Sequence, residues 1–268
     1  MSQVNKAITD TRIQVEPIYK AQSDAFGILD YPFLIDIISR GNANKILDIG
    51  TGEGSFLIGL AQRTKNIEFD AIDLSEELVE IGRSSNRKLG LSINFRHASF
   101  GENYTGSDYD LIMARFAIEH IKELKDIDSF IAATYEKLRT NGWLVIIEYF
   151  VHVLDIDDAT WEKFRKSEMA TYESAKAHPR IALKLPEILM KAKYKNIKST
   201  INHISPSTIG SESFFILIQE YTKLYSQIAP GFWTNELTDE ITTWCNKKEP
   251  EGEPSLFTSY TIGQKIEA

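Results

Sequence analysis

The sequence has little that suits a disulfide-stabilised or membrane-spanning protein. Cys245 is the only cysteine among 268 residues, so no internal disulfide can form, which is typical of a reducing compartment. No apolar run approaches the ~20 residues that cross a bilayer. Residues 1–16 lack the apolar core of a signal peptide. We therefore expect a cytoplasmic protein with no membrane partner.

Basic residues are also in short supply. The chain has 30 Lys and Arg against 38 Asp and Glu, a formal net charge of −8. An acidic chain without a Lys/Arg block repels phosphate backbones, so nucleic acid is not an expected partner. Cysteine and histidine do not cluster either, because Cys245 lies alone in a predicted helix. We expect no metal site.

What the sequence does contain is an alternation of short apolar strands and helix-like segments. Five strands are expected between residues 43 and 150, at 45–50, 67–73, 93–97, 109–115 and 143–150. Two more are expected at 196–204 and 255–264. This alternation implies right-handed crossovers and an α/β fold, with a seven-stranded, mostly parallel sheet and helices on both faces.

The two ends of the chain differ from this core. Residues 1–40 read as helices, with an amphipathic segment at 18–26 and a second segment at 31–39. A further helix is expected at 158–176. Residues 211–247 read as a helical insertion between the last two strands, rich in large aromatic side chains that must bury against something.

A glycine-rich loop stands where the first strand turns into a helix. Residues 48–54 read Asp-Ile-Gly-Thr-Gly-Glu-Gly. Glycines admit positive φ and let a ligand approach the backbone, but such a loop is shared by several cofactor classes. Asp73 at the end of the second strand adds a carboxylate that can accept hydrogen bonds from ribose hydroxyls. The D-x-G-x-G-x-G spacing differs from that of NAD-binding loops.

In these motifs the chain resembles the class I S-adenosylmethionine-dependent methyltransferases. The segments that carry the resemblance are ILDIGTGEGSF (46–56), FDAIDLS (69–75), YDLIMARFAIEHI (109–121) and NGWLVIIEY (141–149). Residues 179–198 also resemble a stretch in the ubiquinone-type and natural-product methyltransferases. The resemblance implies a Rossmann-like fold, S-adenosylmethionine as cofactor and methylation of a small-molecule substrate. It also implies an N-terminal lid at 1–40 and a methyltransferase domain at 41–268, with a cap at 211–247.

The resemblance assigns cofactor contacts to individual positions. At the adenine, Ser99 stands where many members carry an acid, and a hydroxyl accepts a hydrogen bond more weakly. The expected contacts are Tyr19 from the lid, Asp48, Gly50, Thr51 and Gly52 at the methionine part, Asp73 at the ribose, Leu74 and Ser99 at the adenine, and Arg115 and Phe116 at the ammonium group.

Methyl transfer from a sulfonium is an in-line displacement that depends on alignment and exclusion of water. If the nucleophile needs a base, His120 is the first candidate and Glu148, at the end of strand five, the second. A satisfied histidine and a solvated loop acid are the competing interpretations. Tyr149, Phe215 and Trp233 are expected to line an apolar substrate pocket, although the aromatic stripe could equally be core.

Other functions stay open at this stage. The fold could bind the cofactor without transferring its methyl group, as a scaffold or a cyclase. It could also methylate a protein, although an aromatic cap disfavours the open groove that a protein substrate needs. An NAD-dependent oxidoreductase fits the loop spacing less well. The sequence leaves the methylated atom and the oligomeric state open.

Overall fold

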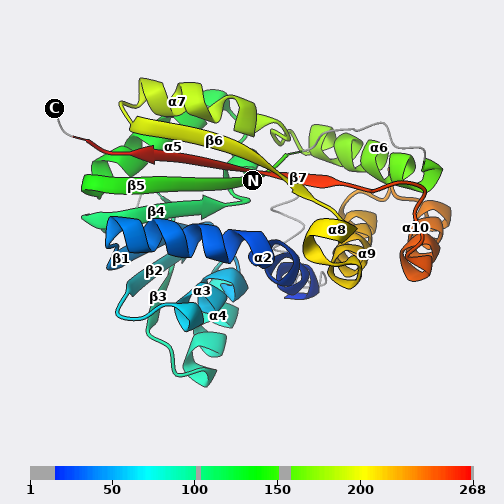
Figure 1. Ribbon diagram of the computed structural model, residues 1–268, viewed down its shortest axis with the longest axis horizontal. Helices are drawn as coiled ribbons and strands as arrows, with labels where there is room; N and C mark the ends of the chain where they lie inside the picture. The colour runs from blue at the N-terminus through cyan, green and yellow to red at the C-terminus, as the bar shows by residue number, and fades with distance from the viewer. Residues whose placement is uncertain (1–15, 101–103, 151–157, 267–268) are drawn as a thin grey trace.

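The computed structural model describes residues 16–100, 104–150 and 158–266. Within these residues a seven-stranded sheet forms the centre of the molecule, in the order β3-β2-β1-β4-β5-β7-β6 (Figure 1). Strand β7 runs antiparallel to both of its neighbours, and the pairs among β1 to β5 are parallel. The expected seven-stranded, mostly parallel Rossmann-like fold is confirmed.

The strands are β1 (Lys45–Ile49), β2 (Glu68–Asp73), β3 (Ile93–His97), β4 (Tyr109–Arg115), β5 (Leu138–Tyr149), β6 (Lys195–Ile204) and β7 (Leu256–Gln264). Strand β5 begins at Leu138, ahead of the expected start at 143. Asn141 and Gly142 therefore lie inside the strand and do not end the preceding helix. The irregularity appears as a register shift against β4, between Tyr109 and Leu111.

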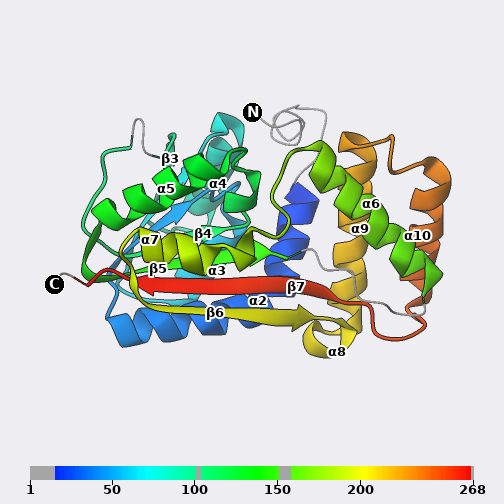
Figure 2. The ribbon, with the colours of Figure 1, turned by 90° about the horizontal axis from the view of Figure 1, so that it is seen from above.

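The helices are α2 (Glu16–Gly41), α3 (Ser55–Arg63), α4 (Glu76–Lys88), α5 (Leu124–Lys137), α6 (Ala159–Ser174), α7 (Leu185–Lys191), α8 (Pro206–Ile209), α9 (Ser211–Ile228) and α10 (Asn235–Lys247), with 3-10 turns η1 (Ile118–His120) and η2 (Ile181–Leu183). Helices α2 and α3 cover one face of the sheet, and α5 and α7 cover the other (Figures 1 and 2). In the part of the chain that the structure describes, no helix is both long and apolar enough to cross a membrane.

Helix α2 is a single helix where the sequence predicts two. It continues through Pro32, whose ring removes one backbone hydrogen bond. Tertiary contacts on both sides of the proline hold the helix together: Asp30 pairs with Arg115, and Tyr31 stacks on Phe56 with ring centroids 4.7 Å apart. Residues 1–15 of the expected lid lie outside the described residues.

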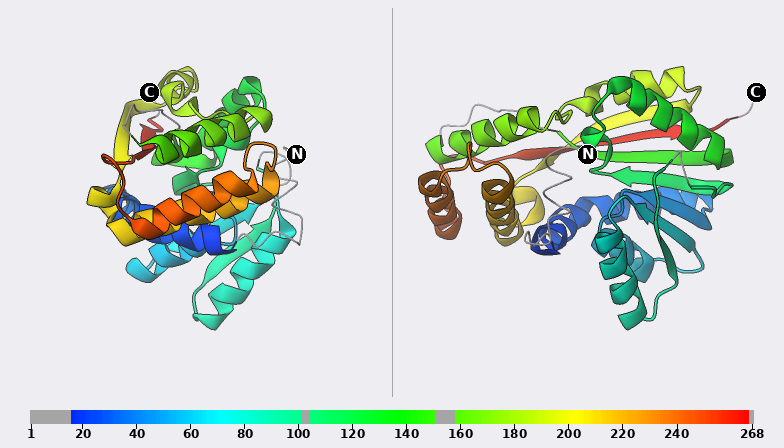
Figure 3. Two further views of the ribbon diagram at one scale, coloured as in Figure 1. Left: turned by 90° about the vertical axis from the view of Figure 1, so that its right-hand side faces the viewer. Right: turned by 180° about the vertical axis from the view of Figure 1, so that it is seen from behind.

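A helical cap stands beyond the end of the sheet at which β4 and β5 finish (Figure 3). We use the word cap for α6, α8, α9 and α10. Its interior is a cluster of large aromatic side chains, among them Trp161, Phe214 and Trp233. The first half of α2 joins the same cluster through Ile18 and Phe26. The cap is therefore packed against the N-terminal helix as well as against itself.

Candidate cofactor and substrate site

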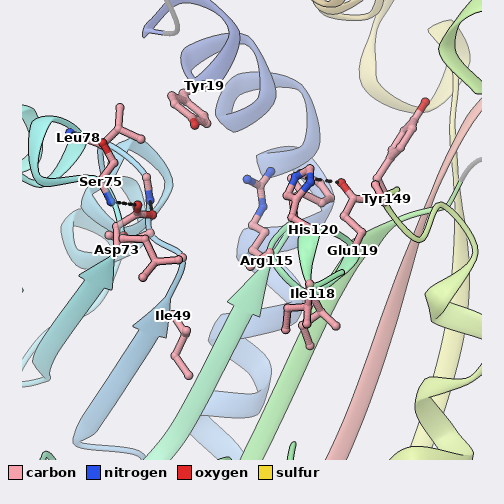
Figure 4. A pocket seen from close by; sticks show the side chains of 18 of the residues that line it. Tyr19, Ile49, Asp73, Ser75, Leu78, Arg115, Ile118, Glu119, His120 and Tyr149 are labelled. Carbon is pink, nitrogen blue, oxygen red and sulfur yellow. Dashed lines mark hydrogen bonds and ion pairs between the residues drawn. The ribbon is translucent and has the colours of Figure 1, made fainter. Parts of the chain in front are cut away.

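A cavity of about 700 Å³ lies between the sheet and the cap (Figure 4). Its walls come from the strand ends at residues 48–56, 72–75, 98–100 and 115–121, and from α2, α5, α6 and α9. Open α/β sheets bind ligands at this edge, and the volume lies within the usual range for small-molecule sites.

The glycine loop begins at the end of β1. Gly50, Gly52 and Gly54 have φ values of +75°, +59° and +79°. A Cβ atom at Gly50 would lie 2.7 Å from the Ala117 Cβ, and one at Gly54 would lie 2.5 Å from the Phe95 ring. Both backbone conformation and crowding therefore require glycine, and the loop passes close to the neighbouring strand end.

Asp73 is held rigidly beside this loop. Its two carboxylate oxygens accept hydrogen bonds from the backbone N–H of Gly52 at 2.8 Å and of Ser75 at 2.9 Å. Burial raises the pKa of Asp73, and these backbone donors oppose the shift. Each oxygen retains acceptor capacity, so a diol such as the ribose could bind at the cavity edge.

Asp48 lies deeper in the cavity wall, followed by Thr51 in the loop. Burial raises the pKa of Asp48 to about 7, and the positive charge of Arg115 acts against this shift. A ligand ammonium group beside Asp48 would favour its ionised form. The residues expected at the adenine, Leu74 and Ser99, also line the cavity, with Leu74 more than half exposed at the rim.

Tyr19 brings the start of α2 over the loop. Its ring would lie 3.5 Å from a Cβ atom at Gly52. Burial and the charges of Asp73 and Glu53 raise the pKa of the Tyr19 hydroxyl. The structure thus places Tyr19 next to the expected ribose site, as a lid residue would be.

Arg115, at the end of β4, locks α2 onto the sheet. Its guanidinium lies 4.3 Å from the ring centroid of Phe56 and 4.2 Å from that of Phe116. It donates to Asp30 at 2.8 Å, and Asp30 also accepts from the Tyr260 hydroxyl at 2.5 Å. This buried network joins α2, β4 and β7. Within it, the Arg115 guanidinium is paired with the Asp30 carboxylate.

Glu119 and His120 line the far side of the cavity, in the η1 turn (Figure 4). Glu119 Oε1 accepts from the Tyr172 hydroxyl at 3.4 Å and lies 3.6 Å from His120 Nε2. Among the described residues, Glu119 Oε2 and His120 Nδ1 are buried without a hydrogen-bond partner. Burial lowers the pKa of His120 to about 4, so the ring is neutral at neutral pH.

Glu148 does not line the cavity, contrary to expectation. Its carboxylate accepts hydrogen bonds from the backbone N–H groups of Ala117, Ile118 and Glu119, at 3.2, 2.8 and 3.4 Å. Neighbouring side chains on a strand point to opposite faces, and Tyr149 is the one that reaches the cavity. Burial raises the pKa of Glu148 to about 8. Glu148 accepts its hydrogen bonds from the turn that carries His120 and is not among the residues that line the cavity.

Phe215 and Trp233 are also displaced from their expected positions. Both are buried inside the cap, where Phe215 packs on Trp244 and the Trp233 indole N–H donates to Thr171. The cavity meets α9 further along, at the side chains of Tyr221, Leu224, Tyr225 and Ile228. The aromatic insertion does line the cavity, but through residues about 9 to 20 Å along the helix from Phe215.

Several cavity residues escaped sequence reasoning. Glu119 precedes His120, and the signal for it was an acidic residue inside an otherwise apolar stretch after β4. Gln22 and Tyr172 gave no local signal, because only the packing of α2 and α6 on the cavity brings them there. Gln22 donates to the Tyr221 hydroxyl at 3.0 Å and so connects α2 to the cap.

Comparison with known proteins agrees with this geometry. Residues 46–142 match the model of a methyltransferase domain family. The carboxy-S-adenosyl-L-methionine synthase of Nautilia profundicola is 29% identical over 119 residues, which cover 44% of this chain and 50% of that protein. The chain thus spans about half the length of this curated relative.

Solved structures share the fold over most of the chain. Phosphoethanolamine N-methyltransferase 2 of Haemonchus contortus, in complex with S-adenosyl-L-methionine, aligns with a TM-score of 0.62 and 14% identity, covering 98% of this chain and 60% of that one. The [4+2]-cyclase SpnF aligns with a TM-score of 0.53 and 17% identity, covering 84% and 76%. The match at 46–142, the glycine loop and Asp73 agree that residues 46–142 form a class I S-adenosylmethionine-dependent methyltransferase domain.

Proposed function

We propose that this chain is a methyltransferase that transfers the methyl group of S-adenosylmethionine to a small molecule. The observation that carries the proposal is that one cavity is lined both by the glycine loop with Asp73 and by the Glu119–His120 turn. A cofactor held at the first set of residues and an acceptor held at the second would share one cavity. In-line displacement needs that arrangement.

The residues around the cavity have separate tasks in this proposal. Asp73 holds the ribose hydroxyls, and Asp48 orients the amino group of the methionine part. Tyr19 covers the loop and Phe116 lies beside it. S-adenosylmethionine supplies the methyl group on a sulfonium, an electrophile that needs no catalytic acid. His120, whose ring is neutral and whose Nδ1 has no hydrogen-bond partner, can accept a hydrogen bond from the methyl acceptor.

The shape of the cavity favours a small acceptor over a protein. Helices α2 and α9 meet above it through the Gln22–Tyr221 hydrogen bond. Tyr149, Tyr172 and Tyr225 enclose its inner end. A protein substrate would have to reach the site through an open groove, and this wall of side chains stands in its way. The relatives include a demethylmenaquinone methyltransferase and a release factor glutamine methyltransferase, so the acceptor class rests on the cavity.

Calorimetry tests the cofactor half of the proposal. S-adenosylmethionine and its demethylated product should bind the full chain with micromolar affinity, and NADH should not compete. A chromatographic assay for the demethylated product, with small amines, phenols and alcohols as acceptors, tests the transfer. Tighter binding of NADH, or cofactor binding with methylation of protein fractions alone, would refute the proposal.

A further inference from the structure

We propose that the acceptor is a small amine that enters the cavity as an ammonium ion, with Glu119 first as its counter-ion and then as its base. This proposal rests on the proposed function, because it names the acceptor class of that same cavity. The evidence comes from the charges, the unpartnered polar atoms and the aromatic walls at the end of the cavity opposite Asp73.

The charges that line the cavity exclude an anionic acceptor. Among the described residues, Arg115 is the single Lys or Arg side chain in the lining, and it is paired with Asp30 at 2.8 Å. A phosphate or carboxylate on the acceptor would find no free positive side chain there. Burying such a group without a counter-ion costs several kcal/mol. Acidic side chains outnumber Arg115 in the same lining.

Two polar atoms without hydrogen-bond partners lie in the turn that lines this end of the cavity. Glu119 is 2% exposed, and its Oε2 has no hydrogen-bond partner. With the His120 Nε2–H directed at Glu119, the neutral ring presents Nδ1 as a second acceptor. An ammonium group offers several N–H donors and satisfies both atoms. Tyr172 donates to the other Glu119 oxygen and stabilises its ionised form.

The surrounding walls are aromatic. Tyr149, Tyr172, Tyr221 and Tyr225 all line the cavity, and successive ring pairs lie 5.5 to 6.3 Å apart. Tyrosine rings attract cations within about 6 Å of their centroids. Tyrosine walls around one buried acid suit an organic cation better than a neutral alcohol.

The protonation of Glu119 follows from its neighbours. The groups that face it are His120 in its own turn, Glu148 from β5, Tyr172 and Glu168 from α6, and Tyr221 from α9. Burial and the nearby negative charges hold the pKa of Glu119 well above its ordinary value. An ammonium ion bound beside Glu119 opposes this shift and favours the carboxylate form, because the cation stabilises the negative charge.

Methyl transfer then balances as follows. The ammonium ion transfers one proton to the Glu119 carboxylate and becomes a neutral amine. Its nitrogen lone pair forms the N–C bond as the C–S bond breaks, and that bond's electron pair goes to sulfur. The product is the methylated ammonium ion beside protonated Glu119. Glu119 then releases its proton to solvent, so that one proton leaves for each methyl group transferred.

Calorimetry on the chain saturated with the demethylated cofactor tests the proposal. The probes are 2-phenylethylamine, 2-phenylethanol and 3-phenylpropanoate, which share a skeleton and differ in charge. The amine should bind at least about tenfold more tightly than the other two. Tighter binding of the acid or the alcohol, or no amine binding, would overturn it.

Variants separate this proposal from the proposed function. Glu119→Gln keeps the side-chain shape and removes the charge, and should weaken amine binding about tenfold. Glu123→Gln is the matched control, because Glu123 is exposed at the start of α5 and does not line the cavity. Both variants should bind the demethylated cofactor like the wild type. Unchanged amine binding in Glu119→Gln refutes the amine proposal, whereas failure of the wild type to bind the cofactor refutes the proposed function.

Discussion

Asp73 is the residue on which the cofactor assignment depends most directly. Its oxygens already accept two backbone hydrogen bonds that fix their direction. Loss of hydrogen bonds to a charged group costs about 1.5–3 kcal/mol. We expect Asp73→Ala to weaken binding of the demethylated cofactor about 10- to 100-fold in calorimetry. Asp73→Asn keeps one oxygen, so its affinity for the demethylated cofactor should lie between those of the wild type and Asp73→Ala. Equal affinity in all three proteins would contradict the assignment.

His120 makes stability depend on pH in a definite direction. Its folded pKa of about 4 is below the 6.5 of an unfolded chain, so the unfolded state binds more protons between these values. The contribution of the neutral His120 ring to the free energy of unfolding is fully present above pH 6.5 and is lost as pH falls toward 4. In urea unfolding, the free energy of unfolding should fall between pH 7.5 and pH 5 by roughly 1–2 kcal/mol more in the wild type than in His120→Asn. An equal loss in both proteins would argue against a buried neutral His120.

The sequence predicted the positions of residues that act within one short motif better than those of residues that are positioned by tertiary packing. Asp73 and the glycines act within a short strand–loop–helix segment, so their positions follow from motif spacing. Glu148 was misplaced because the backbone N–H groups that surround it belong to another strand connection. Phe215 was misplaced because helical periodicity gives the apolar side of α9, but not the turn of the helix at which the cavity begins.

At the scale of the element, α2 is anchored at its middle. Asp30 is 1% exposed and pairs with Arg115, whereas Asp24, one and a half turns earlier, pairs with Lys20 in solvent. Removing one partner of a buried pair costs about 3–5 kcal/mol, and removing one of an exposed pair costs about 0–1 kcal/mol. We expect chemical denaturation to show this contrast between Asp30→Asn and Asp24→Asn. Equal stability of the two variants would mean that α2 is not anchored at Asp30.

The elements that sequence reasoning placed well are those with one unambiguous pattern. The apolar runs of β3 and β4 match their expected bounds, 93–97 and 109–115. The start of β5 was missed because Asn141-Gly142 reads as a helix end, while pairing with Lys265 and Gln264 keeps that segment in the sheet. The two helical segments expected at 18–26 and 31–39 form one helix, because tertiary contacts hold α2 together across Pro32.

At the scale of the whole molecule, the cavity is closed by parts far apart in the chain. Tyr19 and Gln22 come from α2, and Tyr221 from the cap. Binding of the demethylated cofactor should therefore slow hydrogen exchange in the first turns of α2 and in the second half of α9 together. Helix α7, on the opposite face of the sheet, is the internal control. Protection confined to the glycine loop would mean that α2 and the cap do not close on the ligand.

Strand β7 also sets an order of events during synthesis. It lies between β5 and β6, and its Tyr260 holds Asp30. While the ribosome is still adding residues before 256, β6 has no strand to pair with, and one edge of β5 is unpaired. Asp30 is synthesised early, and the Tyr260 hydroxyl that donates to it is synthesised more than two hundred residues later. The nascent sheet stays unfinished, with an edge for chaperones to shield, until residues 256–264 emerge.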